Sequence, residues 1–260
     1  MVDIHCHLLP GLDDGPDTIE ESLRMAEAAI TDGITHVIST PHASDRYKFD
    51  EERVRDHAAQ LRERLGNRLE IATGCDFHMS VDNLQDFYRR PSKYTLNQKD
   101  YLLVEFADFA IAAAMDDALH QLQIAGARPI ITHPERNGLL CANPARLDGW
   151  LKRGCYAQVT AQSLLGRFGP GAQRAAEQWL DEGRVHFVAS DAHNSSSRPP
   201  KLKAAYEVVA KRRGEAVAQA LFHDNPLAAY EGRPLPYEPE LPEEPPAATA
   251  KPKRKRFWFL

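Results

Sequence analysis

Two patterns of apolar residues alternate along most of the chain. Helical segments carry apolar residues every three or four positions, and several of them end at a glycine that precedes a short run of apolar and β-branched residues. Because glycine suits the left-handed position just past a helix end, each of these glycines predicts a joint between a helix and a strand. The joints are Gly33, Gly66, Gly126, Gly154 and Gly183.

Two more strands are predicted, by VDIH near the start of the chain and by YLLVEF at 101–106, so that seven strands alternate with helices. Such alternation is typical of parallel strands that are buried on both faces. Seven units predict an α/β fold of the closed or distorted TIM-like (β/α)7 barrel type. A doubly wound open sheet is the alternative.

Helix starts and helix faces can also be predicted. Thr18 with Glu21 forms the pattern of a capping box, and Asn143 before Pro144 is typical of a helix cap followed by a first-turn proline. The predicted apolar faces are Ile19, Leu23, Ala26 and Ile30 in one helix and Val54, Ala58, Leu61 and Leu65 in the next.

The composition changes after about residue 234. Seven of the 18 prolines lie between Pro234 and Pro252 with glutamates among them, and KPKRKRFWFL adds a basic run and an apolar tip. This composition is typical of an extended, solvated tail rather than of a core element. We therefore expect one domain over 1–236 and a disordered tail over 237–260.

The overall composition is that of an ordinary globular protein, with 43% apolar and 27% charged residues among 260. The net charge of −5 gives no reason to expect nucleic acid as a partner. No apolar run reaches the ~20 residues of a membrane span, and no secretory leader is recognisable. The four cysteines are scattered, so we expect reduced thiols and a cytoplasmic location.

Imidazoles and carboxylates follow six of the seven predicted strands. In α/β barrels the active site forms at the carboxyl ends of the strands, so these side chains are expected at one end of the barrel. A single histidine at a strand end is more often structural, but the coincidence of six strands indicates a shared site. The residues are His5, His7, His42, Asp76, Glu105, His133, Asp191 and His193, with Asp13 and Asp14 soon after the first strand.

Nitrogen and oxygen ligands without a cysteine cluster suit Zn²⁺, Mn²⁺ or Fe. Because one ion cannot use so many ligands, two or three ions are predicted, an arrangement that serves phosphoryl displacement. Arg136 and Arg198 supply guanidinium groups that match phosphate oxygens. The alternative for Arg198 is an ordinary surface-loop arginine.

Other hydrolase chemistries lack their motifs. Cysteine-dependent phosphatases need C-x5-R, but Arg146 stands one position too close to Cys141, and the other cysteines have no arginine at that spacing. The sequence contains neither a G-x-S-x-G nucleophile elbow nor a phosphate-binding G-x-x-x-x-G-K loop.

The chain carries DIHCH, LDDG, STPH, THPER and SDAHN followed by RPP, in that order. This set resembles the PHP (polymerase and histidinol phosphatase) superfamily, and within it the bacterial protein-tyrosine phosphatases of capsular and exopolysaccharide biosynthesis. The resemblance extends over roughly the first 230 residues. It implies a distorted (β/α)7 barrel with a trinuclear metal centre and metal-dependent hydrolysis of phosphotyrosine.

The resemblance also implies roles for single residues. Arg136 and Arg198 match the family's phosphate-binding arginines. The family usually has glutamate where this chain has Asp76. Because the aspartate side chain is one methylene shorter, either its strand lies closer to the ions or the carboxylate bridges them more loosely. The implied ligands are His5, His7, Asp76 and Asp191 for the first ion, Asp76, Glu105 and His133 for the second, and Asp14, His42 and His193 for the third.

The expected cofactors are thus two or three divalent ions, with Mn²⁺ preferred to Zn²⁺ or Fe. The expected substrate is a phosphotyrosine protein, the autophosphorylated tail of a membrane-associated tyrosine kinase that controls polysaccharide synthesis. The basic and aromatic tail at 251–260 predicts peripheral contact with the inner face of the membrane, and a merely solvated tail is the alternative. Two other functions stay open: a small-molecule phosphomonoesterase such as histidinol phosphatase, and a metal-containing regulatory module without turnover.

Overall fold

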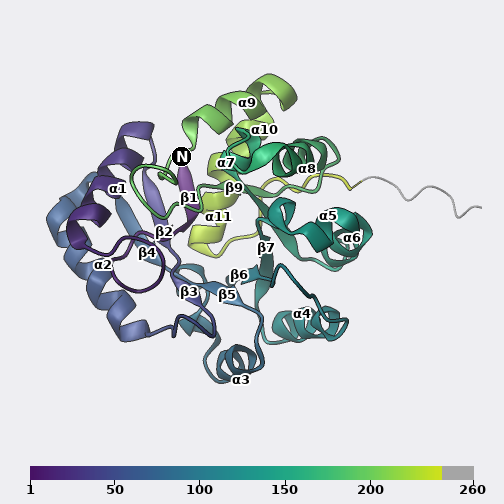
Figure 1. The fold of residues 1–260 in the computed structure, drawn as a ribbon, viewed down its shortest axis with the longest axis horizontal. Coiled ribbons are helices and arrows are strands. Elements are labelled where there is room, and N and C mark those ends of the chain that lie inside the picture. The colour runs from purple at the N-terminus through teal and green to yellow at the C-terminus, as the bar shows by residue number, and fades with distance from the viewer. Residues whose placement is uncertain (242–260) are drawn as a thin grey trace, which may run out of the picture.

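Parallel strands follow one another in chain order around the centre of the molecule, with helices outside them (Figure 1). The computed structural model describes residues 1–241, so the predicted properties of the tail beyond Leu241 lie outside the described residues. The strands in residues 1–241 are β1 (Val2–Cys6), β2 (His36–Ser39), β3 (His42–Ala43), β4 (Glu70–Thr73), β5 (Asp76–His78), β6 (Tyr101–Glu105), β7 (Arg128–Thr132), β8 (Tyr156–Thr160) and β9 (Phe187–Ala189).

The strands form two parallel sheets, ordered β1-β2-β4 and β3-β5-β6-β7-β8-β9. Only two residues separate β2 from β3 and β4 from β5, so each pair occupies one strand position and seven positions result. The order never reverses, as it would in a doubly wound sheet. The first and last positions meet where Cys6 pairs with Ala192 and Asp191 N–H donates to the His5 carbonyl at 2.8 Å. The prediction of a distorted (β/α)7 barrel is confirmed.

The helices up to Asp181 connect successive strands on the outside of the barrel, and further helices follow the last strand (Figure 1). The described helices are α1 (Ile19–Asp32), α2 (Glu51–Leu65), α3 (Val81–Arg89), α4 (Ala114–Ile124), α5 (Gly138–Ala142), α6 (Pro144–Leu151), α7 (Ala161–Leu164), α8 (Gly169–Asp181), α9 (Lys203–Arg213), α10 (Glu215–Gln219) and α11 (Asn225–Glu231), with a 3₁₀ turn η4 (Pro134–Arg136) after β7. Among these described helices, none is long and apolar enough to cross a membrane.

The predicted helix boundaries are largely observed. All five predicted joint glycines have positive φ, between 60° at Gly66 and 93° at Gly126, a range that favours glycine. The predicted face of α2 is buried throughout. In α1 the buried face is Ser22, Met25, Ala26 and Ala29, so Ala26 alone of the predicted set is fully buried.

The predicted caps form only in part. Thr18 accepts from the Glu21 N–H, but the Glu21 carboxylate accepts from Ser195 N–H at 2.8 Å instead of closing a capping box. Asn143 occupies the N-cap position of α6 without a side-chain capping bond. A long-range partner has therefore replaced the local contact that the sequence predicted for Glu21.

The apolar core has an inner and an outer layer. The inner cluster contains strand residues such as Val2, Ile4 and Phe187 together with Ala228 and Ala229 of α11. The outer cluster lies between the strands and the surrounding helices. The segment from α11 onward lies at the amino ends of the strands, because Tyr101 Oη donates to the Arg233 carbonyl and Asn225 Nδ2 donates to the His186 carbonyl.

β1 contains a bulge near its carboxyl end, at the opposite end of the barrel from α11. The register with β2 shifts between Asp3 and Cys6, and Ile4 belongs to the inner cluster whereas Cys6 belongs to the outer one. Bulges of this kind redirect side chains and are common beside active sites. Here the bulge contains the predicted ligand His5 and directly precedes His7.

Candidate metal and phosphate site

The carboxyl ends of the strands bring the predicted site residues together. His5 lies in β1, His42 and Asp76 begin β3 and β5, and Glu105 ends β6. The other candidates lie on the segments that follow β1, β7 and β9, and they are His7, Asp14, His133, Arg136, Asp191, His193 and Arg198.

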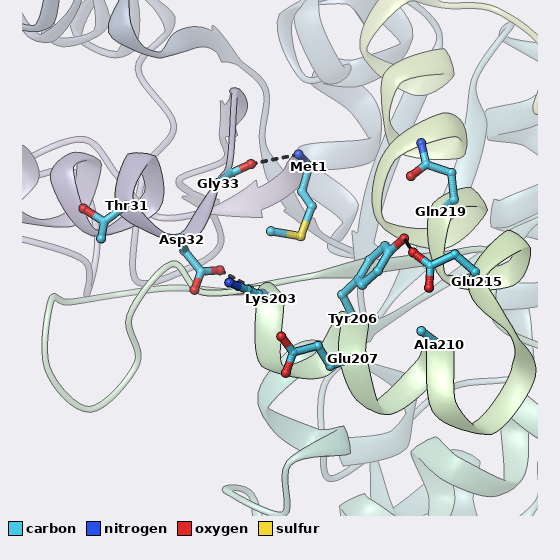
Figure 2. Close-up of a pocket in the computed structure, with 10 residues that line it drawn as sticks. All are labelled: Met1, Thr31, Asp32, Gly33, Lys203, Tyr206, Glu207, Ala210, Glu215 and Gln219. Atoms are coloured by element: carbon cyan, nitrogen blue, oxygen red, sulfur yellow. Dashed lines mark hydrogen bonds between the residues drawn. The ribbon is translucent and has the colours of Figure 1, made fainter.

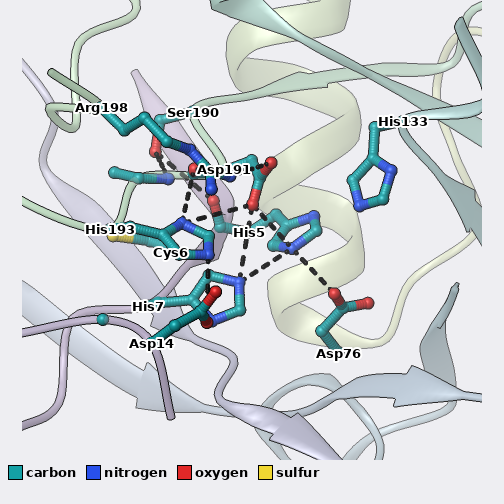
Figure 3. Close-up of polar contacts among 12 residues, drawn as sticks. His5, Cys6, His7, Asp14, Asp76, His133, Ser190, Asp191, His193 and Arg198 are labelled. Atoms are coloured by element: carbon teal, nitrogen blue, oxygen red, sulfur yellow. Dashed lines mark hydrogen bonds and ion pairs between the residues drawn. The ribbon is translucent and has the colours of Figure 1, made fainter. Parts of the chain in front are cut away.

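The first group of candidate ligands contains His5, His7 and Asp76, whose ligand atoms lie within 4.8 Å of one another. Asp191 adjoins this group, because its Oδ1 lies 3.5 Å from the Nε2 atoms of both His5 and His7. Asp76 Oδ2 lies 3.5 Å from His5 Nε2. Figure 3 shows these side chains turned toward one another, and all of them are buried.

The second group contains His7, Asp14, His42 and His193, again within 4.8 Å. Asp14 Oδ1 lies 3.4 Å from His42 Nε2 and 3.5 Å from His193 Nε2. The Asp14 side chain is 46% exposed, whereas His193 is buried. This group therefore lies at the solvent-facing edge of the site.

The third group contains His42, Asp76 and Glu105. His42 Nδ1 lies 3.2 Å from Asp76 Oδ2 and 3.6 Å from Glu105 Oε2, so His42 takes part in two groups. His133 adjoins the third group, with Nε2 3.6 Å from Glu105 Oε1. His78, to which the sequence assigned no role, also adjoins it, with Nδ1 3.7 Å from Glu105 Oε2.

Both candidate phosphate-binding arginines point to one carboxylate. Arg198 Nη2 donates to Asp191 Oδ2 at 2.6 Å and to the Asp191 carbonyl at 3.0 Å, and Arg136 Nη1 donates to the same Oδ2. Arg136 comes from η4 and Arg198 from the loop after β9. Two guanidinium groups thus reach the edge of the ligand groups from separate segments.

Two residues at the site have backbone conformations that non-glycine residues rarely adopt. His133 has φ 32° and Asp191 has φ 50°, both in the left-handed region. Strain of this kind persists where the surrounding structure enforces it, and it is concentrated at functional sites. His133 directly follows β7 and Asp191 stands two residues after β9, where the backbone must turn to aim the side chain.

The buried carboxylates are held in their ionised form. Burial alone would raise the pKa of Asp76, but the charges of His5 and His42 hold this pKa well below its usual range. Burial likewise opposes ionisation of Asp191, and His5 and His7 outweigh it, so the pKa of Asp191 is also well below its usual value. The ionised carboxylates are therefore paired with the imidazoles around them, in positions that metal ions could share.

The imidazoles respond according to their neighbours. Burial would lower the pKa of His42, but the nearby carboxylates of Asp14 and Asp76 raise it to about 12. Burial lowers the pKa of His133 to about 3, and the positive charge of Arg136 adds to this effect. Because a metal ion binds the same ring nitrogens as a proton, metal binding at His42 would release protons.

The side chains fit divalent metal ions. Asp76 is fully buried, yet neither of its carboxylate oxygens accepts a hydrogen bond within residues 1–241. A buried carboxylate without hydrogen bonds is costly unless a cation compensates it. The neighbouring ligands are imidazole nitrogens and carboxylate oxygens, which suit borderline and hard divalent metals.

Two further residues fix the orientation of the histidines. Gln158 Oε1 lies 2.8 Å from His5 Nδ1, and Asp13 Oδ2 lies 2.6 Å from His7 Nδ1. Metal-ligating histidines commonly bind such a partner through the second ring nitrogen. The sequence placed Asp13 at the site without this role, and it missed Gln158, which lies on the one strand without a predicted ligand.

A cavity of about 670 Å³ lies elsewhere, between α1, α9 and α10 (Figure 2). Its lining includes Met1, Asp32 and Tyr206, and none of the predicted ligands. The chemistry indicated by the sequence is therefore concentrated at the strand ends.

A parallel α/β barrel whose strand ends gather histidines and carboxylates is typical of metal-dependent barrel hydrolases. The chain belongs to the family described as capsular polysaccharide synthesis, CpsB/CapC, which it matches over residues 1–231.

Named relatives agree with this family. The chain is 35% identical over 231 residues to the tyrosine-protein phosphatase YwqE of Bacillus subtilis, covering 87% of this chain and 91% of that protein. It is 32% identical over 235 residues to the tyrosine-protein phosphatase CpsB of Streptococcus pneumoniae, covering 87% and 96%. The resemblance found in the sequence motifs is confirmed.

Solved structures give the same result. A structure described under YwqE of B. subtilis and CpsB of S. pneumoniae, as metal-dependent tyrosine phosphatases, matches with a TM-score of 0.86 and 32% identity. The match covers 94% of this chain and 100% of that chain. A histidinol phosphate phosphatase of Lactococcus lactis matches with a TM-score of 0.54 at 10% identity, which shows a shared fold alone.

Proposed function

We propose that this protein is a metal-dependent phosphatase that hydrolyses phosphotyrosine in proteins. The observation that carries the proposal is the convergence of three ligand groups and two guanidinium groups around Asp191 and Asp76 at one end of the barrel. The names of the relatives, which are tyrosine phosphatases, support the same activity.

Each proposed ion has its own set of ligands. The implied sets are His5, His7, Asp76 and Asp191, then Asp76, Glu105 and His133, then Asp14, His42 and His193. The distances within the three groups support these sets, and the position of His42 between two groups makes it a further candidate bridge. We propose two or three divalent ions, with Mn²⁺ preferred to Zn²⁺ or Fe.

Divalent ions bound there would lower the pKa of a coordinated water and neutralise charge on the phosphate. Arg136 and Arg198 would bind two phosphate oxygens and stabilise the charge that develops in the transition state. Their shared contact with Asp191 holds both guanidinium groups beside the ligand groups before substrate arrives. Because phenolate is a comparatively good leaving group (tyrosine pKa ≈ 10), the reaction needs no strong general acid.

We further propose that the substrate is the autophosphorylated tail of a bacterial tyrosine kinase that controls capsular or exopolysaccharide synthesis. The family description of capsular polysaccharide synthesis supports this setting. A kinase at the inner face of the membrane would require a phosphatase in the cytoplasm. The proposed membrane contact of residues 251–260 lies outside the described residues and stays a prediction.

Competing substrates test this proposal. We expect kcat/KM for a phosphotyrosine peptide to exceed the value for histidinol phosphate at least about tenfold in Mn²⁺-loaded protein. A preference for histidinol phosphate would instead indicate the small-molecule phosphomonoesterase. A fully metallated protein that hydrolyses neither ester would indicate a regulatory module.

A further inference from the structure

One aromatic ring lies against both candidate phosphate-binding arginines. The guanidinium carbon of Arg136 is 4.3 Å from the centroid of the Phe168 ring, and that of Arg198 is 5.6 Å from the same centroid. The arginines come from the segments after β7 and β9, whereas Phe168 lies in the turn between α7 and α8. A single side chain therefore connects two loops that otherwise meet at Asp191.

The chain builds a specific turn to present this ring. Gly166 and Gly169 stand on either side of the Arg167–Phe168 pair with φ of 73° and 86°, a conformation that favours glycine. Arg167 N–H donates to the Gln162 carbonyl at 2.9 Å, and Gly169 N–H donates to the Gly166 carbonyl at 3.1 Å. Two left-handed glycines and these bonds fix the backbone on both sides of Phe168.

The contact has a physical consequence for both arginines. A guanidinium group that rests on an aromatic face is attracted by the ring quadrupole and keeps its N–H groups free at its edge. The ring also restricts the rotamers of two long side chains, which would otherwise lose more conformational entropy when they bind a ligand. Phe168 thus favours the arrangement in which both guanidinium groups point to Asp191 and the metal-ligand groups beside it.

We propose that Phe168 is a positioning residue that holds Arg136 and Arg198 together as one binding element for a phosphate dianion. The proposal rests on the proposed function of the site, because it assigns the two arginines to phosphate. It adds a residue from the segment after β8, the strand that supplies none of the predicted ligands. Phe168 acts through the arginines and has no assigned contact with the reacting atoms.

The test measures the binding of inorganic phosphate to the full chain loaded with Mn²⁺, by calorimetry. Phe168→Ala should weaken phosphate binding about five- to thirtyfold while metal content stays unchanged, the range expected for loss of cation–π support at two arginines. Phe168→Leu, which keeps an apolar side chain without a ring face, should lose nearly as much. Phe168→Tyr should restore binding to within about twofold of the wild type.

Phe109→Ala is the matched control, because Phe109 lies on the loop after β6 with 88% of its side chain exposed. It should bind phosphate as the wild type does. A combined variant tests whether Phe168 acts through the two arginines. Adding Phe168→Ala to Arg136→Ala/Arg198→Ala should cause no further loss of phosphate binding. Wild-type binding by Phe168→Ala or by Phe168→Leu would overturn the proposal, as would a further loss in the combined variant.

Phosphate binding needs no turnover, so the experiment distinguishes failure of the proposed phosphatase function from failure of the positioning role of Phe168. A wild-type protein that binds phosphate but hydrolyses no phosphotyrosine peptide would contradict the proposed function and leave the Phe168 test valid. If Phe168→Ala raised KM for a phosphotyrosine peptide and left phosphate binding unchanged, the ring would contact the substrate phenol. That result would overturn positioning through the arginines.

Discussion

The two ends of the barrel are built on opposite principles. At the amino ends of the strands, Val2, Ile4 and Phe187 pack against Ala228 and Ala229 of α11 in a dry apolar cluster. At the carboxyl ends, buried histidines and carboxylates face one another, and the oxygens of Asp76 accept no hydrogen bond in the described part of the chain.

Backbone strain, in contrast, occurs at both ends. The left-handed non-glycine residues His133 and Asp191 lie at the carboxyl end, whereas Asn97 and Gln98 precede β6 at the amino end. It is the buried charge at the carboxyl end that a chain folded for stability alone would avoid. The comparison indicates that one end supplies stability while the other sacrifices some of it for metal and phosphate binding.

The largest expected effect is the loss of a proposed bridging ligand. Asp76→Asn keeps the shape of the side chain but removes its charge, so metal content should fall and phosphotyrosine hydrolysis should fall about a thousandfold or more. The metal-free chain should become less stable, because the carboxylate charge that pairs with His5 and His42 disappears while the imidazoles stay buried. Metal analysis, initial rates and urea unfolding measure these three effects.

Asp76→Glu is the matched control for that variant. It keeps the charge and restores the ligand that is usual in the family, so metal content and rate should stay near those of the wild type. Full activity in Asp76→Asn, or equal losses in both variants, would contradict the proposed role of this carboxylate.

Phe187→Ala tests the amino end of the barrel. Phe187 is fully buried in the inner cluster, so truncation should lower the free energy of unfolding by about 3–5 kcal/mol. The activity per folded molecule should remain near that of the wild type, because the residue lies away from the ligand groups. Equilibrium unfolding measures the loss of stability, and initial rates at low temperature measure the activity. A folded but inactive variant would contradict the division of roles between the two ends.

The arginine variants separate phosphate binding from metal binding. Arg136→Ala and Arg198→Ala should each lower the rate of phosphotyrosine hydrolysis about ten- to a thousandfold, because each removes a charged contact in the transition state. Metal content should stay unchanged, since neither side chain is a proposed ligand. Full activity in Arg198→Ala would return that residue to an ordinary loop position.

Acid should weaken the amino end through His186. This buried residue accepts from Ala157 N–H at 3.3 Å through Nδ1, and burial lowers its pKa to about 4. The folded state thus favours the neutral ring. Its contribution to the free energy of unfolding is complete above the unfolded pKa of about 6.5 and is lost as pH falls toward 4. Between pH 7 and pH 4 the free energy of unfolding should fall by about 3 kcal/mol through this residue.

His186→Gln should lose correspondingly less stability over the same pH range, since glutamine has no proton to gain. Urea unfolding of both proteins at pH 7 and pH 4 measures the difference, because the carboxylates of the site titrate equally in both. An identical pH dependence of the two proteins would contradict this assignment.

The sequence predicts the barrel well because its signals are local. A glycine at a helix end and an apolar run after it stand within a few residues of each other, and Gly33 and Gly126 mark their joints as expected. The split of two strand positions into β2 with β3 and β4 with β5 was not predicted, since it depends on pairing with neighbouring strands.

The candidate ligands could be predicted because each stands directly at a strand end. Their supporting residues could not, because those contacts join distant parts of the chain. Gln158 reaches His5 across 153 positions, and Glu21 leaves its predicted capping role for Ser195. Only the three-dimensional arrangement reveals which polar side chain contacts the second ring nitrogen of each histidine.

In the proposed reaction, metal ions rather than a thiol carry the chemistry. Burial raises the pKa of the Cys6 and Cys75 thiols well above the ordinary value, so neither supplies a ready thiolate. A variant with all four cysteines replaced by serine therefore serves as the control and should hydrolyse phosphotyrosine at a rate near that of the wild type.

The most direct measurement follows phosphotyrosine-peptide hydrolysis by the full chain before and after removal of metal with a chelator. We expect the metal-free protein to have no measurable activity and added Mn²⁺ to restore it, in the wild type and in the four-cysteine variant alike. Hydrolysis that continues in protein shown by metal analysis to be metal-free would contradict a metal-dependent reaction.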